Sequence, residues 1–176
     1  MNIRNTRGFT LPEVLVTLAI VATLAAVLMP ALNNQLSKGD SGRVSSDLVA
    51  VQTAVGAFAS DVRRYPSTLL QLKSTPTGND ILAASFGSLA AKWRGPYLSK
   101  DLGTGNAMPT GYGATISAAF DSTTYNGIPY LTIHITGLTT AEFENIDQIL
   151  DEKANSEAGQ FQLSGTTAVF AAVPIQ

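Results

Sequence analysis

The chain has no cysteine and only one histidine and one tryptophan among its 176 residues. The lack of cysteine excludes disulfides, thiol catalysis and cysteine metal sites. The one histidine, His134, alternates into the polar face of a predicted strand, where a lone histidine is usually structural. No Ser-His-Asp set, phosphate-binding loop or zinc-ligand spacing is present. We therefore expect that the chain is not an enzyme.

Charge is also sparse, with 14% charged residues against 45% hydrophobic ones and a formal net charge of −2. A mildly acidic chain is a poor general binder of nucleic acid. From Val14 to Leu32 there is no charged residue at all. A helix of that length is about 30 Å long, which matches the hydrocarbon core of a bilayer. Residues 9–32 are therefore predicted to form a transmembrane helix in contact with lipid.

The flanks of this apolar run predict its orientation. Arg4 and Arg7 precede it, and the far flank is not strongly basic, so the N-terminus is predicted to be cytoplasmic and the bulk of the chain outside. The alternative is an ordinary secretory signal cut near Thr23-Leu24-Ala25. The apolar run continues past that site, and Glu13 lies where a signal would be purely apolar. A retained membrane anchor is the preferred interpretation.

Glu13 opens the apolar run, and Pro30 lies near its end. A carboxylate in hydrocarbon needs a partner, which the α-amino group of an adjacent subunit could provide. The local alternative is a capping box, in which Glu13 accepts from the Thr10 amide. Pro12 would then lie in the first turn, where its missing N–H costs nothing. The two roles can alternate, capping before assembly and pairing after it, and Pro30 is expected to kink the helix.

The N-terminal motif resembles that of the type IV pilin-like family. In that family a short basic leader ends in Gly, and Phe-Thr-Leu-x-Glu then opens a long apolar helix; here Gly8, Phe9-Thr10-Leu11 and Glu13 match. Pro30 falls where the family often carries a kinking proline. The resemblance implies that residues 1–8 are a leader, which prepilin peptidase removes between Gly8 and Phe9. It also implies N-methylation of Phe9 and pairing of Glu13 with the amino terminus of a neighbouring subunit.

The same resemblance implies a structural function. The subunit would be held in the inner membrane by a single span, and then be moved by the inner-membrane assembly machinery into an extracytoplasmic filament. Its partners there would be copies of itself and other pilin-like subunits. Loss of Arg4 and Arg7 with the leader would leave nine basic against 13 acidic residues, a formal charge of −4.

A second resemblance covers residues 63–102. Arg64-Tyr65-Pro66, followed later by Trp93-x-Gly95-Pro96-Tyr97-Leu98, is similar to the major pseudopilin of type II secretion systems. The Asp-Pro-Trp-Gly stretch that usually follows in that protein is absent. A type IV pilus and a type II secretion pseudopilus therefore both remain open as the filament.

Residues 33–64 are predicted to continue the helix as an amphipathic segment. Gly39 and Gly42 indicate either a soft section of helix or a short break near its start. An apolar stripe at helical spacing then follows. The stripe consists of Val44, Leu48, Val51, Val55, Phe58 and Val62. The helix is expected to end at Arg63-Arg64, because Pro66 disfavours helical geometry at Tyr65.

Residues 65–176 are predicted to form a globular α+β domain with a small antiparallel sheet and short helices. The predicted helices are a turn at Leu69–Leu72, a second at Ile81–Ala91 capped by Asn79 or Asp80, and a third at Thr139–Lys153 with a Thr139–Glu142 capping box. Phe143, Ile146, Ile149 and Leu150 would form the inner face of the third helix and Asp147 part of its acidic outside. The predicted strands are Tyr112–Phe120, Pro129–Thr136 and one or two within Gln160–Val173, around Ser164-Gly165. A hairpin turn is predicted at Asp121–Gly127.

Two ligand hypotheses accompany this domain. Asp121, Ser122 and Asn126 carry oxygens that would suit calcium, but with one carboxylate among them turn chemistry is preferred and no cofactor is expected. A basic–aromatic cluster could stack on single-stranded nucleic acid, although packing anchors are the preferred interpretation. It comprises Lys92, Trp93, Arg94, Tyr97 and Lys100. The alternative functions are thus a minor tip subunit that binds DNA or another ligand and, third, a membrane-anchored enzyme.

Overall fold

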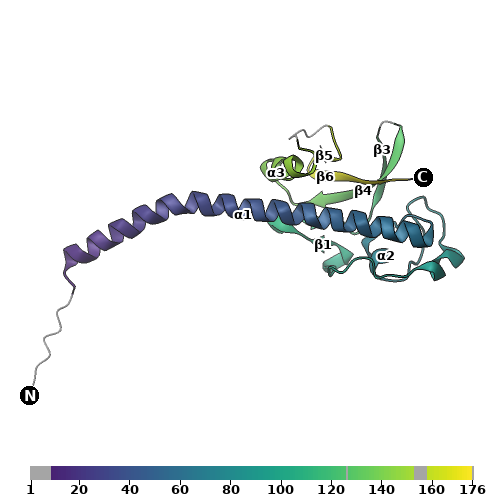
Figure 1. Cartoon of the computed structure of the whole chain (residues 1–176), viewed down its shortest axis with the longest axis horizontal. Coiled ribbons are helices and arrows are strands. Elements are labelled where there is room, and N and C mark those ends of the chain that lie inside the picture. Colours follow the sequence, from purple (N-terminus) through teal and green to yellow (C-terminus); the bar gives the residue numbers. More distant parts are fainter. Residues whose placement is uncertain (1–8, 126, 153–157, 176) are drawn as a thin grey trace, which may run out of the picture. The chain divides into compact units, whose positions relative to one another are not determined.

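The computed structural model describes residues 9–125, 127–152 and 158–175. The chain divides into two compact units, Met1–Ser37 and Lys38–Gln176, which we call unit 1 and unit 2. Helix α1, Leu11–Val62, contributes residues to both (Figure 1). The predicted leader, Gly8 included, lies outside the described residues.

Unit 1 consists of the first part of α1. The helix is unbroken across Pro30. Its two apolar-run threonines satisfy their hydroxyls locally, because Thr17 Oγ1 donates to Val14 O and Thr23 Oγ1 donates to Ile20 O, at 2.8 and 2.9 Å. By length and composition α1 can cross a membrane, a test that a signal sequence would also pass. The predicted apolar helix is therefore confirmed.

In unit 2, α1 is buried along one face. It is continuous through Gly39 and Gly42, so this segment is helical rather than broken. All six residues of the predicted stripe are buried, together with Ser41 and Ala54. The amphipathic continuation is confirmed, and its end at Val62 agrees with the prediction, since Arg63 adopts a left-handed φ of 62°.

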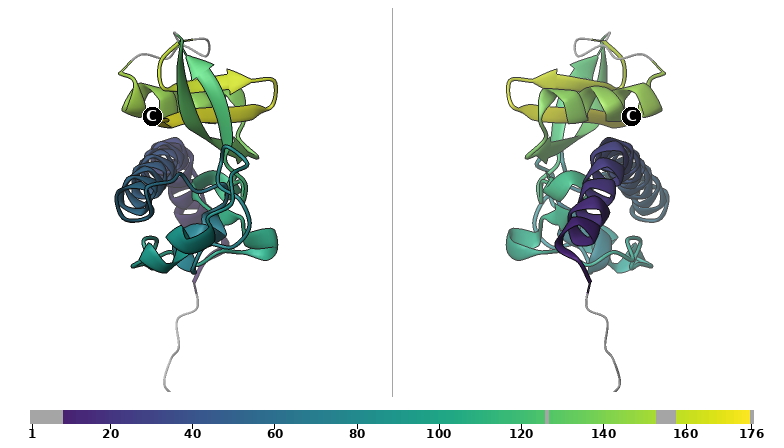
Figure 2. Two further views of the ribbon diagram at one scale, coloured as in Figure 1. Left: turned by 90° about the vertical axis from the view of Figure 1, so that its right-hand side faces the viewer. Right: turned by 90° about the vertical axis from the view of Figure 1, so that its left-hand side faces the viewer.

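The rest of unit 2 is an α+β fold, as predicted. Its helices are α2 (Leu69–Lys73), α3 (Thr140–Leu150) and the 3₁₀ turns η1 (Gly87–Lys92), η2 (Thr104–Asn106) and η3 (Gly111–Gly113). Its strands are β1 (Met108–Pro109), β2 (Thr115–Ile116), β3 (Asp121–Tyr125), β4 (Ile128–Thr136), β5 (Phe161–Ser164) and β6 (Thr167–Pro174). They form an antiparallel sheet of order β1-β2-β4-β6-β5, with β3 also paired to β4. Figure 1 and Figure 2 show β3, β5, β6 and α3 on one side of the unit 2 part of α1, with β1 and the connecting segment around α2 on the other.

The core of unit 2 lies between α1, the sheet and α3. Leu131, Ile133 and Ile135 alternate along β4 and are fully buried, as their period of two predicts. Phe143 of α3 stacks on Phe161 of β5 with ring centroids 4.7 Å apart. The core therefore joins segments that are far apart in the sequence.

The helix predicted at Ile81–Ala91 is wrong. Asp80 Oδ1 accepts from the amides of Leu82 and Ala84 at 3.0 and 2.8 Å, and Ala83 has a left-handed φ of 60°. These bonds from backbone amides to the Asp80 side chain stabilise a tight turn, and a helix does not form there. Within the predicted range only the 3₁₀ turn η1 is helical.

The strand predicted at Tyr112–Phe120 is mostly wrong, since only Thr115–Ile116 belong to a strand, β2. Tyr112 lies in η3 with a φ of 58°. Farther on, Leu69 N donates to Ala118 O and Phe120 N to Ser67 O, at 2.8 and 2.9 Å. These residues therefore bond to the segment that precedes α2, a contact that local pattern cannot show.

The hairpin predicted at Asp121–Gly127 is confirmed, but its turn is shorter than predicted. Asp121–Tyr125 form strand β3, whose last residue pairs with Ile128. Only two residues then remain for the turn, and Gly127 has the φ of 82° that such turns favour. Asn126, the predicted tip, lies outside the described residues. The threonines and tyrosine of this stretch favour a strand, and this outweighs the turn-forming Asp121 and Ser122.

Helix α3 has the predicted capping box between Thr139 and Glu142. Its inner face differs from the prediction, because Asp147 is fully buried and Ile149 is 50% exposed. The buried face follows Phe143, Ile146, Asp147 and the half-buried Leu150, the ordinary i, i+3, i+4, i+7 spacing. The helix ends at Leu150, and Lys153 lies outside the described residues. The last two strands meet at Ser164-Gly165 as predicted, with β6 between β4 and β5.

Candidate functional site

The start of α1 places Glu13 back against the residue that caps the helix. Glu13 Oε2 lies 3.3 Å from Thr10 N and 3.4 Å from Thr10 Oγ1, and both donate to it. Pro12 lies in the first turn. The predicted reach of Glu13 to the Thr10 amide is therefore confirmed. Phe9 lies just before the helix and is 85% exposed.

From Phe9 onward, where the structure describes unit 1, its large apolar side chains are all exposed. Even the least exposed of them, Val14, is 45% exposed, and Leu11 reaches 74%. They comprise Phe9, Leu11, Val14, Leu15, Val16, Leu18, Ile20, Val21, Leu24, Val27, Leu28, Met29, Leu32 and Leu36. Burying one such side chain is worth roughly 1.5–3 kcal/mol. This surface therefore calls for hydrocarbon or other apolar helices around it. The kink predicted at Pro30 stays a prediction.

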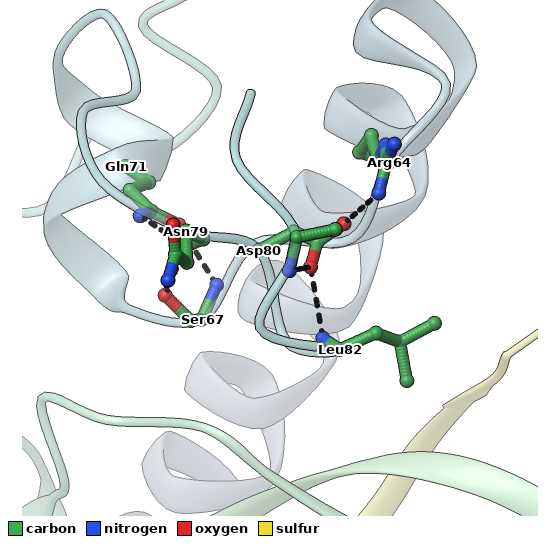
Figure 3. Close-up of polar contacts among 7 residues, drawn as sticks. Arg64, Ser67, Gln71, Asn79, Asp80 and Leu82 are labelled. Carbon is green, nitrogen blue, oxygen red and sulfur yellow. Dashed lines mark hydrogen bonds and ion pairs between the residues drawn. The ribbon is translucent and has the colours of Figure 1, made fainter. Parts of the chain in front are cut away.

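The segment after α1 is fixed to the helix end by a polar network (Figure 3). Arg64 Nη1 lies 2.7 Å from Oδ2 of Asp80, whose side chain is only 2% exposed. Gln71, also buried, accepts from the Ser67 amide at 2.8 Å and donates to Asn79 O at 3.2 Å. Because buried polar groups need partners, these bonds determine the path of residues 65–85.

The aromatic members of the basic–aromatic cluster, Trp93 and Tyr97, are turned inward, whereas Lys92 and Arg94 are exposed. Trp93 Nε1 donates to Gln71 O at 3.2 Å, and Tyr97 OH donates to Asp61 Oδ2 at 2.9 Å. The Tyr97 ring meets both Trp93 and Phe58 edge-on, with centroids 5.9 and 5.8 Å apart. Partial burial, together with Asp61, raises the pKa of the Tyr97 phenol, although the Arg94 amide acts against this. The prediction that Trp93 and Tyr97 are packing anchors is confirmed.

The residues suggested for calcium do not share a loop. Asp121 and Ser122 lie in β3, where Asp121 Oδ1 accepts from the Ser122 amide at 2.8 Å. In the part of the chain that the structure describes, no three His, Asp or Glu side chains are grouped closely enough to hold a metal ion. His134 is half-buried, with Nε2 3.4 Å from Thr132 Oγ1.

Two cavities of unit 2 place charged residues that are neighbours in the sequence beside residues from other elements. One, of about 890 Å³, lies at the end of α3 and includes Tyr125, Tyr130, Asp151 and Glu152 in its lining. The other, of about 460 Å³, lies at the end of α1 and includes Arg63, Lys92 and Arg94. The sequence grouped Lys92 with Arg94 but not with Arg63, and it gave no sign that Asp151 and Glu152 lie beside Tyr125 and Tyr130.

Comparison with known proteins extends the N-terminal observations. Residues 3–29 match the model of the prokaryotic N-terminal methylation motif. The chain is 38% identical over 71 residues to type II secretion system core protein G of Pectobacterium carotovorum subsp. carotovorum, covering 40% of this chain and 46% of that protein. It is 40% identical over 74 residues to the core protein G of Klebsiella pneumoniae, covering 40% and 53%. It is 45% identical over 51 residues to the type IV major alpha-pilin of Moraxella bovis, covering 29% and 32%.

The chain thus spans about half the length of the core G proteins that it matches, and less of the pilin. No solved structure gives a significant match.

Proposed function

We propose that this chain, a type IV pilin-like protein by its methylation motif and its relatives, is a structural subunit of a type IV pilus or a type II secretion pseudopilus. One observation carries the proposal. The methylation motif leads into a helix whose large apolar side chains are all exposed through Leu36. Unit 2 closes its own core, so the apolar surface of unit 1 needs a partner outside the chain. Lipid would provide it before assembly, and the same helices of other subunits would provide it in a filament.

Processing is part of the proposal. Prepilin peptidase would cut between Gly8 and Phe9 and leave Phe9 as the N-methylated terminus. The matched motif spans this bond, and Phe9 is exposed and precedes the helix. Glu13 would then exchange its bonds to Thr10, which at 3.3 and 3.4 Å are long, for the charged terminus of a neighbouring subunit.

The location follows from the same residues. Arg4 and Arg7 favour a cytoplasmic N-terminus, a single span of the inner membrane and a unit 2 outside. The partners would be prepilin peptidase, the inner-membrane assembly machinery and other pilin-like subunits. A tip-binding role is not favoured, because Trp93 and Tyr97 make their contacts inside unit 2. A structural role requires no catalytic group.

The first experiment is N-terminal sequencing and intact mass of the protein from its native membrane. A start at Phe9 with one added methyl group is expected. Gly8→Val should leave the leader in place, whereas Gly39→Ala, a glycine change inside α1, should be processed normally. A start near Ala26 would indicate ordinary secretion, and an uncut Met1 would indicate a plain membrane anchor; either result would overturn the proposal.

A second experiment separates the two roles of Glu13. Glu13→Gln keeps an oxygen that can accept from Thr10 but removes the charge, and Glu13→Asp keeps the charge. We expect Glu13→Gln to be processed and to give few or no filaments, with Glu13→Asp retaining part of the yield. Wild-type filament yield in Glu13→Gln would show that capping alone accounts for this residue.

A further inference from the structure

Unit 2 carries a surface of unbalanced positive charge, which we call the basic cluster and define as Arg63, Lys92 and Arg94. All three are exposed and line the cavity of about 460 Å³ at the end of α1. Among the described residues none of the three forms an ion pair. The one carboxylate in that lining, Asp61, accepts a hydrogen bond from Tyr97. The dipole of α1 favours a cation at Arg63, but Lys92 and Arg94 have no such support.

A second surface carries unbalanced negative charge. The acidic groove, defined as Tyr125, Tyr130, Asp151 and Glu152, lies in the cavity of about 890 Å³ between the β3–β4 hairpin and the end of α3. Among the lining residues that the structure describes, the charged ones are Asp151 and Glu152, both acidic. Residues 153–157, which follow, contain one lysine and one glutamate and so add no net charge to the chain.

The acidic groove is built to receive a cation. The carboxyl end of a helix carries partial negative charge, which cations normally offset, yet the last turn of α3 contains no basic residue. Asp151 and Glu152 follow directly and add to that charge. Tyr125 and Tyr130 meet edge-on with centroids 6.0 Å apart, and aromatic faces attract guanidinium groups. Among the described residues neither tyrosine hydroxyl forms a hydrogen bond, so both remain available to a ligand.

The occupant that these charges fit is a second copy of the chain. The two surfaces share no lining residue: the basic cluster lies at the end of α1, and the acidic groove lies at the end of α3 beside the β3–β4 hairpin. We propose that the basic cluster of one subunit docks in the acidic groove of the next, with Arg94 over the tyrosine rings. Such a contact joins two different surfaces and therefore propagates along a filament. The inference rests on the proposed filament function and adds to it the residues that join neighbouring globular units.

The absence of cysteine makes a direct test possible. The full-length chain with Arg94→Cys and Glu152→Cys, expressed in its native host, should form a ladder of crosslinked multimers on oxidation. The matched control pairs Arg94→Cys with Asp121→Cys, an exposed acidic position outside the lining of the groove. That pair, and each single variant, should give no ladder beyond a dimer.

Charge reversal tests the same contact independently. Arg94→Glu and Glu152→Arg should each lower filament yield by about tenfold or more, and the combination should restore it. Asp121→Arg should resemble the wild type. A start at Phe9 and an unchanged unfolding curve in each variant would show that processing and folding are intact.

The outcomes separate the two proposals. If the wild type forms filaments but the cysteine pair gives no ladder and the reversals assemble normally, the contact is wrong and the filament function stands. If the wild type neither starts at Phe9 nor assembles, the function is wrong and the contact falls with it. If Arg94→Glu assembles normally but loses retention on a single-stranded DNA column, the basic cluster serves nucleic acid and the contact is again wrong.

Discussion

The two parts of α1 are both helical, but their apolar side chains differ in burial. In unit 1 the large apolar side chains are all exposed, with Leu24 at 57%. In unit 2 the apolar stripe is completely buried, with Leu48 and Phe58 at 0%. In a uniformly apolar helix the sequence does not specify which face is buried, whereas an apolar stripe at helical spacing does. The comparison teaches that different parts of one helix can be buried in different ways. The unit 2 part of α1 is buried by its own chain, whereas the unit 1 part needs apolar surroundings from outside the chain.

Polar contacts differ in the same way. The bonds of Thr10, Thr17 and Thr23 in unit 1 each join residues three apart. Unit 2 has bonds that join distant segments, such as Tyr65 OH to Pro174 O at 3.0 Å. Local bonds stabilise a helix in any surroundings, whereas long-range bonds require a particular tertiary structure.

The largest expected effect comes from a substitution in the buried stripe of α1. Phe58→Ala should destabilise unit 2 by about 3–5 kcal/mol, because it removes a fully buried ring and leaves a cavity. The measurement is urea unfolding of the full chain in detergent, followed by the fluorescence of Trp93, the chain's one tryptophan. Val21→Ala, the control in unit 1, should shift this transition by less than about 0.5 kcal/mol.

The next largest effect is expected from a substitution in the exposed apolar run of unit 1. Val21→Arg places a cation near the middle of the apolar run and should disfavour membrane insertion by about 2.5–3.5 kcal/mol. The membrane-bound fraction of the protein should fall, with the unfolding curve of unit 2 unchanged. Val49→Arg, at a 47% exposed position of α1 in unit 2, should change neither. Equal loss of membrane binding in both variants would contradict the division between the two units.

A smaller effect is expected when a buried polar contact of unit 2 is removed, and it can be compared with the loss of an exposed one. Asp80→Ala should cost about 2–3 kcal/mol, because it leaves the Leu82 and Ala84 amides without their acceptor and Arg64 without its partner. The same unfolding measurement applies. Asp101→Ala, which removes an exposed ion pair with Lys73, should leave the unfolding curve almost unchanged.

The smallest effect concerns that exposed pair. The hydrogen bond and charge of Lys73 lower the pKa of Asp101 below its usual value of 3.8. The pair's small contribution to stability is therefore present above that value and is lost as the pH falls through the lowered pKa. Lys73→Met should return the pKa of Asp101 to its ordinary value in an NMR titration. An unchanged pKa would show that the pair does not persist in solution.

Sequence periodicity predicted the elements whose residues depend on their immediate neighbours. The stripe from Val44 to Val62 and the capping box of Thr139 have the predicted form, and the apolar residues of β4 are buried as predicted, although Thr132 on its other face is buried too. The predictions at 81–91 and 112–120 were wrong because side-chain or long-range bonds replace the expected pattern there, and the turn within 121–127 was predicted too long. Asp80 bonds to nearby amides, and the segment before α2 takes the bonds of Ala118 and Phe120.

For the candidate site the division is similar. Gly8, Phe9 and Glu13 were found from the sequence, because the processing motif is a contiguous stretch of residues. The basic cluster was found only in part, because the sequence grouped Lys92 with Arg94 but not with Arg63. The acidic groove was not found, because Tyr125 and Tyr130 lie far from Asp151 and Glu152 in the chain. Asp147 was also assigned to the wrong face, since its charge suggested exposure while its helical register places it inside.

The sequence by itself determined the motif, the apolar run and the buried stripe of α1, because each is encoded in neighbouring residues and the helical period. Only the tertiary structure decided which surfaces of unit 2 remain unbalanced in charge. That decision depends on long-range packing, which pairs Arg64 with Asp80 and Lys100 with Asp47 and leaves Arg94 and Glu152 exposed. Two charges pair only when they lie close together in space, and the order of residues along the chain does not show which charges will do so.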